Sequence, residues 1–413
     1  MKKRRQSSSY GSRWKSFQVA GVICLIAFLL SCAPQILAQI IVKGRVLGAD
    51  AQPMRMASVS LTLPEEIHAQ RTVQAHESGE FSITIDSAGL WILHFTGVGF
   101  RDHRVAVYVD KPQTIEINVR LGGYRYLSDF GRVTVVGDFN RWFVLSAVPM
   151  KKRTDGTYTA MVKTAVDTLA YQLNQVRDGY AVEGTQADRY VFDASRGYIS
   201  VMDVKPGIVK IIFDPRKLFR HSTWATVHFE HATSIVPQFA SIYDELQRDQ
   251  EEFVTSQRNF LRSGRSHQDF KYDWSGPLSS FEKQIKETKV RVLREELWLS
   301  RVMIAMTAGR MNDSLCDATL HEIAPSSSVW SLNAHSLFFL LAHSGWTEAQ
   351  CDEFVQQTLR TNRDEGVKVA LVYDLYMAAK LSSQGQKAKR YKDLLLTRYG
   401  RTPEAAQVKQ QGY

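Results

Sequence analysis

The 413-residue sequence has only four cysteines and lacks the short motifs that mark common catalytic sites. No two cysteines stand in Cys-x-x-Cys spacing, which excludes a dithiol redox centre of that type. A Gly-x-Ser-x-Gly elbow, a His-Glu-x-x-His zinc motif and a glycine-rich phosphate loop are missing as well. His321-Glu322 is followed shortly by Pro325, which would break a zinc-binding helix. We therefore expect no catalytic residue, no cofactor and no metal ion.

A continuous basic stripe is also missing beyond the N-terminal segment. The formal net charge is +10, but six of the 52 basic residues precede Gln39, where no acidic residue occurs. The remaining 46 basic residues stand against 42 acidic ones. Because electrostatic binding to nucleic acid needs clustered Lys and Arg, we expect no nucleic-acid partner. The composition, 44% hydrophobic and 23% charged, excludes bulk disorder, and the length predicts two to four domains.

Residues 1–38 have the order of an export signal. The basic run Lys2–Arg5 precedes the uncharged apolar stretch Phe17–Leu30. Leu29–Cys32 resembles the lipobox of bacterial lipoproteins, in which the cysteine is lipidated, whereas Ile36–Ala38 suits ordinary signal cleavage. An uncleaved anchor is a third alternative, although the stretch is shorter than the ~20 residues that span a bilayer. We expect an exported protein, periplasmic or associated with the outer membrane, and membrane-bound if Cys32 is acylated.

Short alternating runs from residue 39 to 122 predict the first of two immunoglobulin-like β-sandwiches. The strand candidates are Ile41–Val46, Ala57–Leu61, Glu80–Ile85, Leu90–Phe95, Arg104–Val109 and Thr114–Val119. Turn glycines and core residues in this segment resemble those of the carboxypeptidase regulatory-like domain: Lys43–Val46, Ala57–Val59, Ser78–Phe81, Ala88–Trp91 and Gly99-Phe100. The resemblance implies a rigid spacer without an active site of its own. The histidines of the segment lack metal-ligand spacing.

A second sandwich is predicted for residues 123–235, around the buried run Val133–Val136 and the turn that ends in Trp142. The stretch Val133–Trp142 resembles the glycogen-binding module of AMP-activated protein kinase and the early-set, isoamylase N-terminal-like modules of starch-branching and debranching enzymes. In that family sugars stack on two tryptophans and are held by a lysine and an asparagine. Trp142 matches the first tryptophan.

The other sugar-binding positions of this family are changed. Gln172 stands at the lysine position, Tyr180 follows the Asp178-Gly179 turn where the second tryptophan is expected, and Ile199 replaces the asparagine. The resemblance implies an α-glucan or other polysaccharide as ligand, with Trp142, Tyr180, Gln172 and Asn140 as candidate contacts. The alternative is a purely structural module in which Trp142 packs over the sandwich edge.

From residue 236 to 413 the apolar residues recur every three or four positions, which predicts an all-α helical domain, either a bundle or a tetratricopeptide-like array. The predicted helices are 242–260, 281–307, 330–342, 349–359, 366–381 and 388–399. Ala324–Trp330 and Tyr399–Ala405 resemble the helical segment that precedes the thioredoxin domain of exported thiol-disulfide oxidoreductases. We expect the thioredoxin domain itself to be absent, because no Cys-x-x-Cys motif occurs. Cys316 and Cys351 either form a disulfide that adds about 3–4 kcal/mol, or remain buried thiols on different helices.

Two functional hypotheses follow. The first is a non-catalytic extracytoplasmic scaffold or binding protein, with a glycan bound by the second sandwich and a protein partner bound by the helical domain. The second is a glycan-active enzyme, or a degenerate relative of the oxidoreductases. The enzyme hypothesis requires a cleft with convergent titratable groups in the helical domain.

The export signal generates the first testable prediction. We expect the wild-type protein in the membrane fraction if Cys32 carries acyl chains, because more than one chain anchors a protein stably. Fractionation of wild type and Cys32→Ala is the measurement. Loss of membrane association in the variant alone identifies a lipid anchor, whereas a cytosolic wild type contradicts export.

Overall fold

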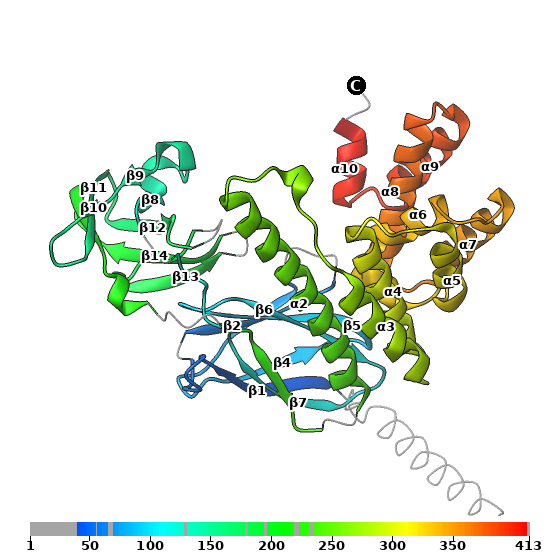
Figure 1. Ribbon diagram of the computed structural model, residues 1–413, viewed down its shortest axis with the longest axis horizontal. Coiled ribbons are helices and arrows are strands. Elements are labelled where there is room, and N and C mark those ends of the chain that lie inside the picture. The colour runs from blue at the N-terminus through cyan, green and yellow to red at the C-terminus, as the bar shows by residue number, and fades with distance from the viewer. Residues whose placement is uncertain are drawn as a thin grey trace, which may run out of the picture. The chain divides into compact units, whose positions relative to one another are not determined.

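The computed structural model describes residues 39–410 except 55, 65–68, 128–129, 178–180, 194–195, 219–222 and 232–233. The predicted export signal, Cys32 and Tyr180 therefore lie outside the described residues. A β-sheet-rich part extends to Phe229, and a helical part begins at Ile235, as predicted (Figure 1).

Two four-stranded sheets form the first sandwich. One has the order β16 (Thr226–Phe229), β7 (Thr114–Arg120), β1 (Ile40–Leu47) and β4 (Glu80–Ile85). The other has the order β3 (Arg71–Gln74), β2 (Ala57–Thr62), β5 (Gly89–Gly97) and β6 (His103–Val109). Buried residues of both sheets, such as Val42, Ile117, Leu93 and Val107, share one apolar core.

Strand β5 is buried on both of its faces. Trp91, Leu93 and Phe95 point into the sandwich core, whereas Leu90 and Ile92 belong to the core of the helical part. Alternate residues of a strand face opposite sides, so the continuous run Leu90–Leu93 needs apolar partners on both. Burial of a Leu or Ile side chain contributes about 1.5–3 kcal/mol.

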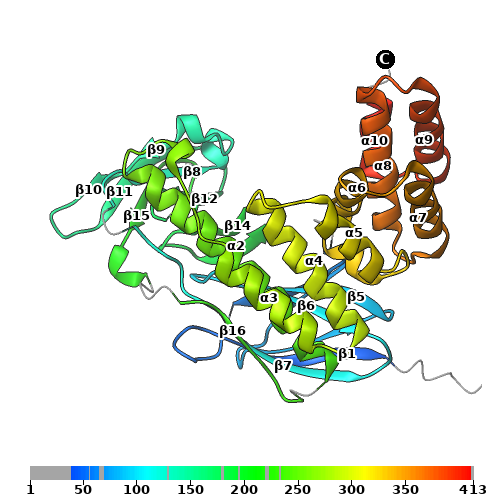
Figure 2. The ribbon, with the colours of Figure 1, turned by 45° about the vertical axis from the view of Figure 1, so that its right-hand side comes forward.

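Helix α2 (Ile235–Arg262) supplies the outer partner of this sheet. Phe239 and Ile242 pack in the same core as Leu90 and Ile92, and the Phe239 ring is stacked on Tyr108 of β6 with centroids 5.8 Å apart. Figures 1 and 2 show α2 lying across the sheet that contains β5 and β6. The predicted boundary at residue 236 is therefore not a boundary between cores, because one core spans it.

The second sandwich is inserted between two strands of the first. Its five-stranded sheet has the order β13 (Arg189–Asp193), β14 (Gly197–Asp203), β12 (Thr168–Asn174), β8 (Thr134–Gly137) and β9 (Val148–Pro149). Its three-stranded sheet has the order β10 (Lys151–Lys152), β11 (Tyr158–Thr164) and β15 (Gly207–Phe213). β16 then pairs antiparallel with β7 of the first sandwich, in the register Val227 to Val119. The prediction that residues up to 235 belong to the second sandwich is thus wrong, because the main-chain groups of 226–229 pair with β7.

The outgoing and returning chains touch at Gly122. A Cβ atom at Gly122 would lie 2.1 Å from the carbonyl oxygen of Thr223, and the Gly123 N–H donates to the Thr223 hydroxyl at 3.3 Å. Glycine is needed here for close approach of two backbones.

The helical part continues after α2 with further amphipathic helices. They are α3 (Ser275–Glu287), α4 (Arg291–Thr307), α5 (Asp313–Glu322), α6 (Ala334–Ala342), α7 (Glu348–Thr361), α8 (Glu365–Leu381), α9 (Gly385–Arg398) and α10 (Pro403–Gln410). The helix predicted for 281–307 is two helices, because Thr288 and Val290 are extended between them. α5 and α10 were not predicted. No described helix is long and apolar enough to cross a membrane.

The two cysteines of the helical part are free thiols in the structure. Cys316 is fully buried on α5, whereas the sulfur of Cys351, on α7, lies 3.7 Å from the Leu341 carbonyl oxygen at the end of α6. The predicted disulfide is therefore not formed, and the alternative of two thiols on different helices describes the fold.

Glu296 is a buried acid in the helical core. Its side chain is fully inaccessible on α4, and neither carboxylate oxygen has a hydrogen-bond partner among the described residues. Burial raises the pKa of Glu296 well above its ordinary value, since the charged form is poorly solvated there. The folded protein therefore holds a proton that the unfolded chain releases.

The close approach at Gly122 predicts that Gly122→Ala destabilises the protein. The new methyl group must displace backbone, so we expect a loss of about 1–3 kcal/mol in the free energy of unfolding. Gly276→Ala on α3, where a Cβ atom meets nothing within 4 Å, is the matched control and should be neutral or slightly stabilising. Denaturant unfolding measures both, and equal stability of the two variants would contradict the crossing.

Burial of Glu296 predicts stability that falls as pH rises. Above the ordinary glutamate pKa the unfolded state binds fewer protons than the folded state, so the loss is about 1.4 kcal/mol per pH unit up to the raised pKa. Glu296→Gln removes this dependence and should be more stable than wild type at pH near 8. Unfolding titrations across pH, with exposed Glu287→Gln as control, test this; parallel curves for wild type and Glu296→Gln would exclude it.

Candidate functional site

The turn after β8 presents Trp142 in a strained conformation. Arg141 and Trp142 have φ values of 54° and 60°, in the left-handed region that bulky residues rarely adopt. Such a conformation costs about 1 kcal/mol or more per residue and persists only where the surroundings enforce it. Strain of this kind clusters at functional sites, which makes Trp142 a candidate.

Asn140 enforces this turn through its side chain. Its Oδ1 accepts from the Gly137 N–H at 3.0 Å, and its Nδ2 donates to the carbonyl oxygens of Phe143 and Ser146, each at 3.1 Å. The Trp142 N–H also donates to the Gly137 carbonyl at 2.8 Å. Asn140 therefore holds the turn that carries Trp142, and its predicted contact with a sugar stays a prediction.

Gln172 has a supporting role as well. It lies on β12, is 3% exposed, and its Nε2 donates to the carbonyls of Arg196 and Tyr198 at 2.8 Å each. Its amide nitrogen is thus committed to the backbone of β14 and the turn before it. Gln172 thus supports the segment that carries Arg196, and its predicted direct contact with a sugar stays a prediction.

Trp142 and Gln172 line a cleft of about 1360 Å³ between the second sandwich, the β5–β6 turn and the end of α2. The second sandwich supplies an apolar wall, which consists of Trp142, Val144, Leu145, Ala147 and Pro149. Val144 and Leu145 are 63% and 88% exposed. Exposed apolar side chains that gather in one place often mark a binding site, and Val144 and Leu145 do so on this apolar wall.

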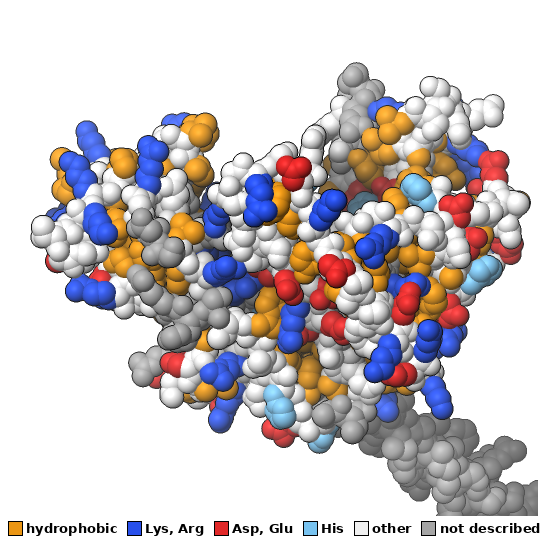
Figure 3. All heavy atoms as spheres, viewed as in Figure 1, with side chains coloured by type: hydrophobic (Ala, Val, Ile, Leu, Met, Phe, Trp, Pro, Cys, Tyr) orange, Lys and Arg blue, Asp and Glu red, His pale blue; other side chains and the backbone are white. Residues whose placement is uncertain are grey.

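Arginines are prominent among the other residues that line the cleft. Among the described lining residues there are seven of them, Arg101, Arg125, Arg132, Arg177, Arg196, Arg258 and Arg262, against the two carboxylates of Asp102 and Glu251. Figure 3 shows Lys and Arg side chains along the hollow beside the second sandwich. The sequence has no basic stripe here, because five separate segments contribute these residues.

The cleft arginines are held by different contacts. The Arg196 guanidinium lies 4.9 Å from the centre of the Trp142 ring, a cation–π distance, and 3.4 Å from the Asp193 carboxylate. Arg101 forms an ion pair of 2.9 Å with Glu251 of α2. Arg125 and Arg132 are exposed and make no ion pair with the part of the chain that the structure describes. Their charges are open to a ligand.

Buried polar groups fix the two sandwiches to each other below the cleft. The Tyr198 hydroxyl lies 3.3 Å from the Ser58 and Thr96 hydroxyls of the first sandwich. The Gly99 N–H donates to the Glu183 carboxylate, and burial raises the pKa of that carboxyl while the hydrogen bond opposes the rise. Burial likewise raises the pKa of Tyr198. These contacts keep the walls of the cleft in place.

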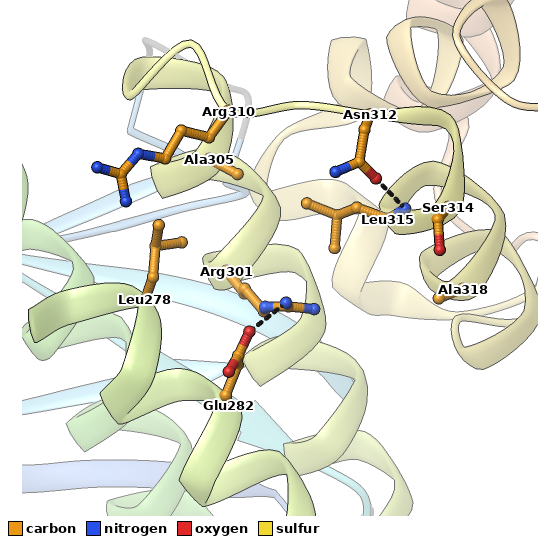
Figure 4. A pocket seen from close by; sticks show the side chains of 9 residues that line it. All are labelled: Leu278, Glu282, Arg301, Ala305, Arg310, Asn312, Ser314, Leu315 and Ala318. Carbon is orange, nitrogen blue, oxygen red and sulfur yellow. Dashed lines mark hydrogen bonds and ion pairs between the residues drawn. The ribbon is translucent and has the colours of Figure 1, made fainter. Parts of the chain in front are cut away.

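A smaller cavity of about 400 Å³ lies in the helical part, between α3, α4 and the start of α5. Figure 4 shows Glu282 of α3 and Arg301 of α4 pointing toward each other within it, as an ion pair. Glu282 is the one carboxylate among its described lining residues. The carboxylate of Glu282 is thus held in an ion pair. Hydrolysis of glycosidic bonds, by contrast, commonly uses two carboxyl groups. No group of three metal-binding side chains occurs among the described residues.

No protein-family model and no curated protein matches the sequence. Solved structures that resemble parts of the chain include catechol 1,2-dioxygenase from Pseudomonas arvilla C-1, with 10% identity, a TM-score of 0.17, and 22% of this chain and 55% of that chain covered. A candidate carbohydrate-binding protein from Bacteroides uniformis matches with 13% identity, a TM-score of 0.17, and 46% and 98% covered.

A shaft pilin from Lactobacillus rhamnosus GG matches with 10% identity, a TM-score of 0.17, and 43% and 82% covered. The chain spans about half the length of the dioxygenases it matches. Similarities at this level assign no function to the chain.

Proposed function

We propose that this chain is a non-catalytic, exported binding protein that holds a glycan in the cleft of the second sandwich. The observation that carries the proposal is Trp142, which a strained and internally hydrogen-bonded turn places on the apolar wall of that cleft. An aromatic ring stacks well on the apolar C–H face of a sugar. The sequence resemblance to glycogen-binding modules also indicates Trp142 as a sugar-binding residue.

The dimensions of the cleft suit an oligomer. Sites for single small molecules measure about 300–1000 Å³, and this cleft is larger and open at its exposed rim. Trp142 is half-buried, so part of its side chain remains accessible although the Arg196 guanidinium lies over its ring. A sugar chain that follows the apolar wall meets Trp142, Val144 and Leu145 in succession.

The first sandwich and the helical part act as a scaffold in this proposal. Their common core makes them a rigid support, and the ion pair from Arg101 to Glu251 connects α2 to the β5–β6 turn beside the cleft. The helical part would bind a protein partner. Export rests on the predicted signal in residues 1–38.

Trp142→Ala tests the stacking platform. We expect glycan affinity to fall roughly tenfold, since a lost aromatic stack costs about 1–1.5 kcal/mol beyond its buried area. Calorimetric titration of the full chain with neutral and acidic oligosaccharides, maltoheptaose among them up to millimolar concentration, is the measurement.

Phe143→Ala is the matched control for this experiment. Phe143 is 58% exposed in the same turn and is absent from the described lining of the cleft, so its loss should leave affinity unchanged. If Trp142→Ala binds every glycan as well as wild type does, the module is a structural spacer and the proposal fails.

A further inference from the structure

The cleft carries a strong excess of positive charge on the surface that would contact a glycan. Its described lining contains seven arginines and two carboxylates. Arg101 is paired with Glu251 at 2.9 Å and Arg196 with the Asp193 carboxylate at 3.4 Å. Arg125 and Arg132 are exposed. A neutral sugar chain needs no such charge, because hydroxyl groups are recognised by polar side chains without it. The excess therefore indicates a ligand with negative groups.

We propose that the ligand of the cleft is an anionic polysaccharide, whose carboxylate or sulfate groups pair with the arginines while a sugar ring stacks on Trp142. This inference rests on the proposed glycan-binding function and specifies its ligand class. Arginine suits the task, since its planar guanidinium forms two parallel hydrogen bonds with a carboxylate or sulfate and keeps its charge at any physiological pH.

The arrangement of the two walls matches the chemistry of such a polymer. The Arg196 guanidinium lies over the Trp142 ring, 4.9 Å from its centre. A sugar that stacks on this ring either displaces the guanidinium from that face or uses the other face, and it has a cation close by in both cases. Arg125 and Arg132 are exposed on the second sandwich, and Arg258 and Arg262 lie one turn apart at the end of α2. Acidic groups along a sugar chain can therefore pair with Arg125 and Arg132 while one ring contacts Trp142.

Single-stranded nucleic acid also combines negative charge with stacking, but the described cleft favours it less. Binding of successive bases uses successive exposed aromatic rings. Here Tyr124 and Tyr198 are each only 6% exposed, and Phe192 packs on Tyr198 with ring centres 5.3 Å apart. The described lining thus has no row of fully exposed aromatic rings, which suits a sugar chain with spaced charges better than a stack of bases.

The experiment measures binding of four probes to the full chain: maltoheptaose, a hexamer of galacturonate, a sulfated dextran oligomer and a thymidine oligomer of equal charge. The proteins are wild type, Arg125→Gln/Arg132→Gln and Trp142→Ala. Arg363→Gln/Arg401→Gln is the control, because both residues are exposed in the helical part and absent from the described lining. Titrations run between about 0.05 and about 0.3 M NaCl, since salt screens exposed charges over roughly 10 Å.

We expect an acidic glycan to bind at least roughly tenfold more tightly than maltoheptaose at low salt, and its affinity to fall as salt rises. Arg125→Gln/Arg132→Gln should weaken it by about a hundredfold, roughly tenfold for each lost charge-assisted bond, and the control by less than about twofold. The galacturonate and sulfated probes distinguish carboxylate from sulfate as the recognised group.

Other outcomes overturn the inference in distinguishable ways. Equal affinity for neutral and acidic glycans, with no salt dependence and no effect of the arginine variant, leaves glycan binding intact but refutes an anionic ligand. Loss of binding in the arginine variant without any effect of Trp142→Ala refutes the stacked glycan itself. Tighter binding of the thymidine oligomer than of both acidic glycans assigns the cleft to nucleic acid. If the arginine variant fails to fold, the salt dependence of wild type still distinguishes an anionic ligand from a neutral one.

Discussion

Burial of β5 on both faces is the constraint on which the rest of this structure depends. The run Leu90–Leu93 has apolar side chains at consecutive positions, so one sheet face alone cannot remove them from water. The sandwich core takes Trp91 and Leu93, and α2 and its neighbours take Leu90 and Ile92. The first sandwich and the helical part therefore stabilise each other, and neither buries its apolar surface without the other.

The second sandwich is attached to this unit as an insertion whose two connections meet at Gly122 and Thr223. Two chain crossings fix an orientation more firmly than a single linker would, and the Tyr198 and Glu183 contacts add buried polar partners on either side. The cleft is a consequence of that attachment, since its lining comes from both sandwiches and from α2. A module of the same sequence released from the first sandwich would lose one wall.

The chemistry of the cleft combines features that are costly to maintain without a ligand. A tryptophan in the left-handed region, exposed Val144 and Leu145, and a concentration of arginines each oppose stability or solubility. Their coincidence in one place is the reason for the binding role proposed for the second sandwich. The paired Glu282 and Arg301 in the helical cavity, by contrast, neutralise each other.

The sequence by itself determined the local elements: alternation predicted most of the strands, the three-to-four-residue period predicted most of the helices, and the turn after Val136 singled out Trp142. These signals are local, because they depend on backbone geometry and on which face of one element is apolar. The partner of each face is decided by tertiary packing. Only the fold could show that residues 226–229 pair with β7 and that Asn140 and Gln172 bond to the backbone. It alone brings arginines separated by up to 161 positions, from Arg101 to Arg262, into the lining of one cleft with Trp142.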